Sequence, residues 1–212
     1  MQQDADKFSD EYIKANCPHC DRSHPAFKFY LQETPNFHIV ADENSIVEGH
    51  TLLLPKAHLS CIGEYPDEIW SEFIKNYKQI KQFIASEYGP VASFEHGVLG
   101  QTVYHSHVHF MPFTGGPEEI VPEGAGPLQK IDSLEQLKDI YKKDGGYLFF
   151  SLGDDMWVVD KALAAPRFFR DRFAKAVGRP ERGNWKAMLD SPIKKDSDKE
   201  ARNFVQNWKT HL

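Results

Sequence analysis

Apolar residues divide the chain into short β-rich segments and one long amphipathic segment. The β-rich segments are aromatic and β-branched and are separated by polar, turn-forming residues, as in an antiparallel sheet. They predict strands over residues 27–31, 37–41, 51–54, 91–94 and 103–110. Between the third and fourth strands, apolar residues recur every three or four positions. This spacing predicts a long helix over 66–87, opened by Pro66 and closed before Gly89.

A Gly/Pro-rich stretch, residues 114–130, interrupts the pattern and predicts a boundary. It would separate a first domain, 1–113, from a carboxy-terminal extension, 131–212. The extension carries the signals of a hairpin followed by two helices. These elements are predicted over 147–150, 156–159, 166–177 and 198–208, and the charged run 194–199 is interpreted as solvated. The predicted fold class is α+β: an antiparallel sheet with a long helix packed on it, and an α+β extension packed on the first domain.

Length, charge and cysteine content limit which partners and compartment are expected for this protein. The chain has 212 residues, a net charge of -6 and no apolar run near the ~20 residues that cross a bilayer. We therefore expect no affinity for duplex nucleic acid or for membranes, and the absence of an apolar leader predicts a cytoplasmic protein. An odd number of cysteines, with two residues between Cys17 and Cys20 on a tight turn, suits a metal clamp better than disulfides. Cys61 stands alone and is predicted in the core.

Three of the ten histidines alternate in the segment His105-Ser106-His107-Val108-His109. In a strand, alternate side chains point to one face, so these three imidazoles would line up. An unprotonated imidazole nitrogen can attack phosphorus near neutral pH. The same row could also be a polar strand face, or could hold a divalent cation without any nucleophile.

The segment 100–112, Gly-Gln-Thr-Val-Tyr-His-Ser-His-Val-His-Phe-Met-Pro, resembles the signature of the histidine-triad (HIT) family. Upstream, 42–58 resembles a second hallmark of that family, an acidic residue followed by Gly-His and then Pro-Lys-x-His. With the Cys-x-x-Cys motif, the resemblance covers about residues 17–112. It implies a HIT-like sheet and a nucleotide ligand, with a preference for adenine. It also implies that the protein is a nucleotidyl hydrolase or transferase.

The resemblance also implies roles for individual residues. His107 would be the nucleophile that forms a covalent nucleotidyl-histidine, with His109 and His50 orienting the site and stabilising phosphate charge. Asp42 would bind the ribose hydroxyls, or would be only a turn residue. The remaining positions predicted to contact phosphate or the bridging oxygen are Gln101 and Thr102, although a strand threonine also reflects β propensity.

By the same resemblance, a zinc ion would be held by Cys17, Cys20, His58 and His105. Four protein ligands leave no open position, so this zinc would be structural. His19 and His24 lie close enough in sequence to replace His58.

The chain departs from the family pattern at Glu95, where most HIT hydrolases carry Asn. An ionised carboxylate there would repel polyphosphate, or it could serve as a general base or raise the basicity of a histidine. His96 beside it is interpreted as a turn residue. Glu95 and the extension together resemble CwfJ-type relatives, which are linked to RNA processing. Arg167, Arg170 and Arg172 form either a solvated helix face or a phosphate contact.

Three functions remain in view at this point. The leading hypothesis is attack by His107 on the α-phosphate of a nucleotide conjugate, such as a dinucleoside polyphosphate or a phosphoramidate. The alternatives are a CwfJ-type module that binds a nucleotide or an RNA end, and a metal-dependent phosphodiesterase. Small HIT proteins are commonly dimers, so a homodimer is expected unless the extension covers the dimer face.

Overall fold

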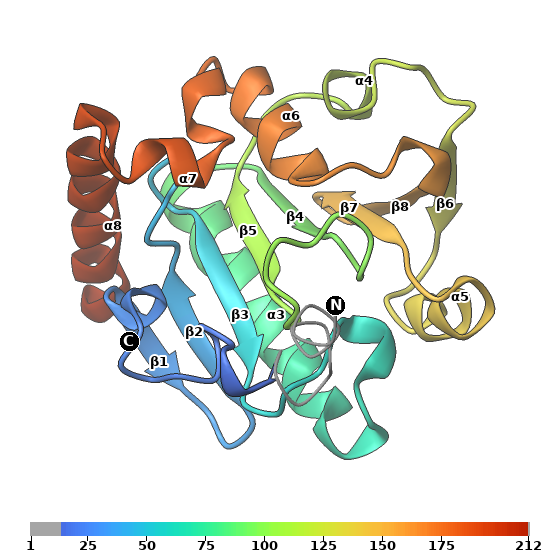
Figure 1. The fold of residues 1–212 in the computed structure, drawn as a ribbon, viewed down its shortest axis with the longest axis horizontal. Coiled ribbons are helices and arrows are strands. Elements are labelled where there is room, and N and C mark those ends of the chain that lie inside the picture. The colour runs from blue at the N-terminus through green and yellow to red at the C-terminus, as the bar shows by residue number, and fades with distance from the viewer. Residues whose placement is uncertain (1–13, 212) are drawn as a thin grey trace, which may run out of the picture.

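A single antiparallel sheet runs through the molecule (Figure 1). The computed structural model describes residues 14–211; positions 1–13 of the predicted first domain and position 212 of the predicted extension lie outside that range. Within this range the strands lie in the order β1-β2-β3-β5-β4-β7-β8-β6. Their bounds are β1 Tyr30–Glu33, β2 Phe37–Ala41, β3 Thr51–Pro55, β4 Val91–Glu95, β5 Val108–Pro112, β6 Leu128–Ile131, β7 Leu148–Leu152 and β8 Asp155–Val159.

Two helices cover opposite faces of this sheet. Helix α3 (Asp67–Tyr88) packs on the face that carries the odd residues of β2, among them Phe37 and Ile39. Helix α6 (Phe168–Ala176) packs on the other face, where the Phe94 and Phe173 rings stack 4.9 Å apart. Because successive side chains of a strand point to opposite faces, the sheet contributes to one apolar core under α3 and to another under α6.

Shorter helices and the last helix surround this framework. Helix α8 (Pro192–Thr210) packs Phe204 and Trp208 beside Phe83 of α3. None of the helices described is long and apolar enough to cross a membrane. The remaining bounds are α4 Pro117–Ile120, α5 Gln136–Asp144, α7 Trp185–Met188, α8 Pro192–Thr210, and the 3₁₀ turns η2 Pro25–Phe27, η3 Ile62–Glu64, η4 Lys161–Leu163 and η5 Pro180–Arg182.

The predicted α+β class is confirmed, and the sheet continues across the predicted boundary. Strand β7 of the extension pairs with β4 along most of its length, from Ala92 opposite Leu152 to Glu95 opposite Phe149. The stretch 114–130 itself contains α4 and the start of β6. The division into 1–113 and 131–212 stays a prediction about organisation along the chain. In space, the extension adds β7 and β8 to the sheet, and the end of the connecting stretch adds β6.

The predicted strand over 103–110 is wrong in its first half, because β5 begins only at Val108. Before it, the backbone N–H of Ser106 donates to the carbonyl of Leu59 and that of His105 to the carbonyl of Val103. His105 and His107 are thus held by loop contacts instead of by strand alternation. The charged run 194–199 was also wrongly expected to be solvated throughout, since Lys194 donates to the Glu43 carbonyl and Ser197 is buried in α8.

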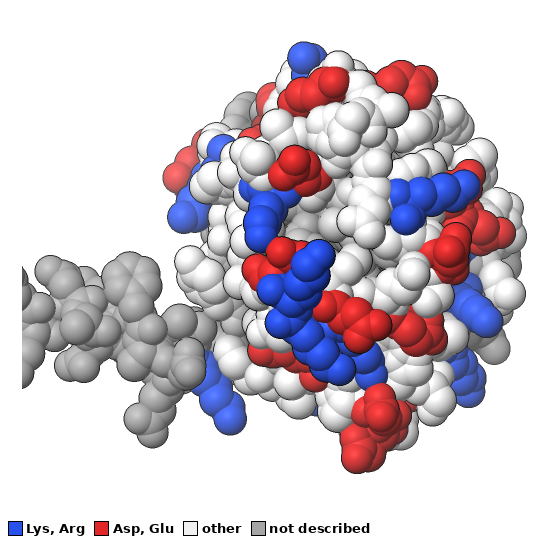
Figure 2. All heavy atoms as spheres, turned by 90° about the vertical axis from the view of Figure 1, so that its right-hand side faces the viewer, with Lys and Arg blue, Asp and Glu red and all other residues white. Residues whose placement is uncertain are grey.

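Acidic and basic side chains are interspersed on the face that carries α5 and the β6–β8 edge (Figure 2). Several of them are paired, including Lys130 with Asp155 and Lys161 with Asp144. Such mixing produces no extended field of one sign on the described part of this face.

Candidate functional site

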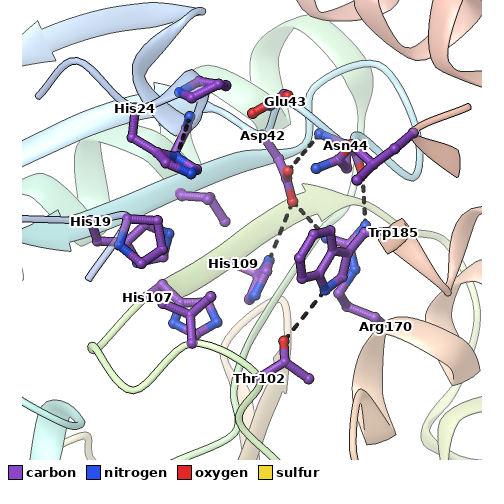
Figure 3. A pocket seen from close by; sticks show the side chains of 16 residues that line it. His19, His24, Asp42, Glu43, Asn44, Thr102, His107, His109, Arg170 and Trp185 are labelled. Atoms are coloured by element: carbon purple, nitrogen blue, oxygen red, sulfur yellow. Dashed lines mark hydrogen bonds and ion pairs between the residues drawn. The ribbon is translucent and has the colours of Figure 1, made fainter. Parts of the chain in front are cut away.

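A cavity of about 300 Å³ opens on the sheet face opposite α3, between the first strands and the extension (Figure 3). Both parts of the chain line it. The contributors are Pro18, His19, His24, Pro25, Ala26, Asp42, Glu43, Asn44, Leu52, Thr102, Val103, His107, His109, Arg170, Trp185 and Leu189.

Hydrogen bonds assign the proton position on three buried histidines. His50 Nδ1 accepts from the backbone N–H of Ile46 at 3.1 Å, so its proton lies on Nε2. That Nε2 lies 2.9 Å from His109 Nδ1 and donates to it, which leaves the His109 proton on Nε2. His107 Nδ1 lies 2.6 Å from the carbonyl oxygen of His105 and must donate to it. Nε2 of His107 is therefore the nitrogen with a free electron pair.

Burial keeps these imidazoles neutral. It lowers the pKa of His50 to about 4, lowers that of His107, and takes the pKa of His109 well below its ordinary value. Within the part of the chain that the structure describes, Nε2 of His109 has no hydrogen-bond partner. A buried N–H group left in this way beside a cavity suits an acceptor atom of a ligand.

Asp42 meets Arg170 in a buried ion pair at one side of the cavity (Figure 3). The guanidinium Nη1 lies 2.6 Å from Asp42 Oδ2, and Nη2 donates to the carbonyl of Asn44. Burial alone raises the pKa of Asp42, but Arg170, His50 and the backbone N–H of Asn44 outweigh it and lower the pKa to about 2. The prediction of a solvated arginine face is wrong for Arg170, which is only 6% exposed.

Beside the cavity, Cys17, Cys20, His58 and His105 bring one donor atom each to within 4.8 Å of all the others. Three Sγ–Nδ1 distances, from Cys17 to His105 and from Cys20 to His58 and His105, run from 3.3 to 3.5 Å. Ligands of a tetrahedral Zn²⁺ lie about 3.5 Å apart, given Zn–S and Zn–N bonds near 2.2 Å. His105 Nε2 donates to the carbonyl of Pro55 at 2.8 Å, so its Nδ1 presents a free electron pair to the sulfurs. The donor set therefore fits zinc.

Comparison with known proteins bears on the segment that forms this site. A model described as "HIT domain" matches residues 24–115. An uncharacterized HIT-like protein of Methanocaldococcus jannaschii is 34% identical over 109 residues, which cover 49% of this chain and 82% of that relative. The chain belongs to the HIT family.

Other HIT proteins match this chain at lower sequence identity. The protein named hit of Bacillus subtilis is 30% identical over 97 residues, 43% of this chain and 64% of that relative, just under two thirds. The solved structure of a HIT family protein from Bacillus anthracis is 23% identical, covers 61% of this chain and 95% of its own, and has a TM-score of 0.42. The HIT match ends at 115, so the extension lies outside it, and its CwfJ resemblance stays a prediction.

The structure brings only part of the predicted HIT site together. His50, Asp42, His107, His109 and Thr102 meet at the cavity or its wall. Gln101 does not line the cavity, because its amide donates to the carbonyl of Ser60. His19 lines the cavity, with its ring 5.2 Å from that of His107, and is not one of the four clustered donors. His24 instead caps η2 by accepting from Ala26, so His58 keeps its predicted place.

Glu95 is not brought to the histidines, which corrects its proposed place among the catalytic groups. It follows Phe94, whose ring stacks on His109, and so points to the opposite, α3-side face of the sheet. There the carboxylate accepts from Ser106 Oγ, Tyr147 Oη and the backbone N–H of Ile62. Burial raises the pKa of Glu95 to about 7 against these hydrogen bonds. His96 is held by α6, where its Nε2 accepts from the backbone N–H of Phe169.

Three contributors from the extension were missed as partners of the histidines. Arg170 was named in the sequence only as one of three helix cations, while Trp185 and Leu189 had no assigned role. Each contacts the cavity across more than 60 residues of sequence from the histidines. Local sequence patterns carry no signal for contacts between residues so far apart along the chain.

Proposed function

We propose that this HIT protein is a nucleotidyl hydrolase or transferase that acts on the α-phosphate of a nucleotide conjugate, with adenine favoured as the base. The observation that carries the proposal is the 2.6 Å contact from His107 Nδ1 to the His105 carbonyl. It holds the proton away from Nε2, so the nitrogen of a cavity-lining imidazole is ready to attack without first losing a proton.

In the proposed first step, the Nε2 electron pair of His107 forms a bond to phosphorus, and the bond from phosphorus to the leaving group breaks with its electron pair leaving on that group. The imidazole then carries a positive charge, which the His105 carbonyl stabilises through the Nδ1–H bond. In the second step water or another acceptor attacks phosphorus, the N–P electron pair returns to Nε2, and the acceptor proton passes to solvent.

His109 and His50 support these steps as hydrogen-bond donors. The Nε2–H of His109, which lacks a partner among the described residues, would donate to a phosphoryl oxygen as negative charge develops there. The His50 contact at 2.9 Å keeps His109 in the tautomer that can donate. Asp42 completes the group, with its Oδ2 3.5 Å from His50 Nε2.

The zinc proposed for Cys17, Cys20, His58 and His105 would tie the chain before β1 to the segment before β5. When bound, it supplies structural cross-linking and no activated water. Metal analysis of the purified chain should give about one zinc per molecule. Cys17→Ser should lose the metal and unfold at a lower temperature; a metal-free wild type with unchanged stability would contradict this assignment.

Turnover of a fluorogenic adenosine phosphoramidate tests the main proposal. We expect activity that persists in EDTA at short incubation and disappears in His107→Ala. His211→Ala is the matched control, because this histidine is exposed at the end of α8 and pairs with Glu87. Reactions denatured at alkaline pH within one turnover, where a P–N bond survives, should leave the nucleotidyl group on the wild-type and His211→Ala chains and not on His107→Ala.

A catalytic cation is the second candidate, favoured by one observation. His96, His107 and His109 offer nitrogen atoms within 4.8 Å of one another. Immediate loss of activity in EDTA and its recovery with Mn²⁺ alone would favour that reading over the covalent route. Binding of AMP without turnover of any nucleotide conjugate would instead favour the nucleotide-binding module.

A further inference from the structure

We propose that Trp185 of the extension is the ring-binding wall of the cavity, where the flat aromatic ring of a nucleotide packs while its phosphate lies at His107. This rests on the proposed function, because that function places the phosphate. Trp185 lies 70 positions beyond the residues that match the HIT domain, so the wall is an addition of this chain to the family site.

The cavity combines two kinds of lining. His107, His109 and Arg170 provide donors or charge, whereas Leu52, Trp185 and Leu189 are apolar. Figure 3 shows the indole of Trp185 in the cavity beside Arg170, with its N–H directed at Thr102. A ligand that is complementary to both parts of the lining carries an anionic group and a flat apolar ring. The cavity volume of about 300 Å³ is at the lower end of the range for small-molecule sites.

The Trp185 side chain is accessible to a ligand that enters the cavity. It is only half-buried at the start of α7, and Leu189 after that helix remains 46% exposed although it is large and apolar. Met188 between them is fully buried and anchors the helix. The two outward residues of an anchored helix thus offer apolar surface to the cavity instead of to the core.

Polar contacts fix this wall relative to the histidines. Arg182, just before α7, donates to the carbonyls of Ser45 and Ile46 in the β2–β3 turn and pairs with Glu200 of α8. Arg170 reaches the same turn through Asp42 and Asn44. Since His50 accepts from Ile46 in that turn, the wall and the histidine relay share one support. A pre-organised aromatic wall binds a ring with little loss of conformational entropy.

Stacking on an indole sets the expected selectivity. Every nucleobase has a π-face, so an aromatic platform binds rings without discriminating strongly among bases. The wall by itself therefore gives no preference for adenine, and any such preference would come from other cavity residues. We expect AMP and GMP both to bind better than ribose 5-phosphate, which has the same phosphate and sugar but no base.

Calorimetric titration of the full-length chain with AMP and with ribose 5-phosphate tests the inference. Trp185→Ala should weaken AMP about tenfold or more, while leaving ribose 5-phosphate unchanged. Trp185→Phe, which keeps a flat ring, should recover most of the AMP affinity. Trp70→Ala is the matched control, since Trp70 lies on α3, donates to Glu135 and does not line the cavity.

The outcomes separate the two proposals. A wild type that binds neither ligand overturns the proposed function and this inference with it. AMP binding that is equal in wild type and Trp185→Ala overturns the inference alone. An equal loss for both ligands also overturns it, because it makes Trp185 a structural residue. If Trp185→Ala does not fold, Leu189→Ala at an exposed position supplies the same comparison and should weaken AMP but not ribose 5-phosphate.

Discussion

Arg170 links the extension to the site through a single buried charge pair. Its guanidinium contacts Asp42 and the carbonyls of Asn44, Gly183 and Arg182, so most of its donors are satisfied by the protein. Asp42 in turn accepts from the backbone N–H of Asn44 and lies near His50. The carboxylate expected to bind ribose hydroxyls is thus already paired, and any ribose contact would be shared with Arg170.

Removal of Arg170 should leave the buried Asp42 charge without its partner. We expect Arg170→Met to lower the free energy of unfolding by about 3 kcal/mol or more, as measured by urea denaturation at pH 7. The double variant Arg170→Met/Asp42→Asn should recover much of this loss, because it removes the uncompensated charge as well.

Arg172→Met is the control for this prediction. Arg172 lies two positions away on the same helix and pairs with Glu123 at the surface, where such pairs contribute at most about 1 kcal/mol. Equal effects of the two single variants would contradict a special role for the buried pair. The pKa of Asp42, about 2 in the folded chain, adds a pH signature. Since it lies below the unfolded value near 3.9, the stabilisation is present above about pH 4 and is lost as pH falls toward 2.

At the scale of elements, the spacing of apolar residues predicted the helices and strands whose position depends on local sequence alone. The strand 37–41 and the helix that the structure places at Asp67–Tyr88 follow directly from spacing and helix-end signals. The hairpin of β7 and β8 was predicted from two apolar runs around a Gly-Asp turn. Strand β6 and helix α5 were not predicted, because their few apolar residues pack against β8 and η3, which are distant in sequence.

For the site, the sequence predicted which residues take part better than it predicted where their side chains lie. The four clustered metal donors and the pairing of His50 with His109 agree with motifs that lie far apart along the chain. Glu95 was assigned to the histidines because it stands where most HIT hydrolases carry Asn, yet strand alternation turns it to the other face. The pairing of β4 with β7 that buries it there could not be read from either strand alone.

Gly100 joins the histidine loop to the extension and allows no side chain. Its φ is +77°, and a Cβ built there would lie 2.3 Å from the carbonyl oxygen of Ala165. That oxygen is backbone just before α6, and the Gly100 carbonyl accepts from the N–H of Arg167. A side chain would have to push the two segments apart, so the loop before the histidines and the start of α6 are coupled.

We expect Gly100→Ala to combine backbone strain with this clash, at a cost of about 2–4 kcal/mol. Gly124→Ala is the matched control: its φ is +97°, but nothing lies within 4 Å of its Cβ position. Thermal unfolding of both variants separates the two effects. If Gly124→Ala lowers the melting temperature as much as Gly100→Ala does, the loop and the extension are not coupled by this contact.

On the scale of the whole molecule, the extension completes the fold that carries the site. Strand β7 pairs with the outer edge of β4, and α6 covers Phe94 and Ala92 on the cavity face. Without them, the sheet of the matched HIT residues would end in an unpaired edge beside uncovered apolar side chains. In this chain β4 is an interior strand, so a partner subunit could not pair with it there.

A cut in the chain should therefore behave differently from a deletion. We expect a chain ended at residue 115 to be aggregated or unfolded, because it exposes the β4 edge and loses Arg170 from Asp42. A protease site placed in the exposed segment 122–126 cuts the backbone and leaves every strand present. The two fragments should then elute together in size-exclusion chromatography and retain the AMP affinity of the uncut chain, since the β4–β7 ladder and the arginine contacts hold them. Separation of the fragments, or a folded and AMP-binding 1–115 chain, would show that the first part carries the site alone.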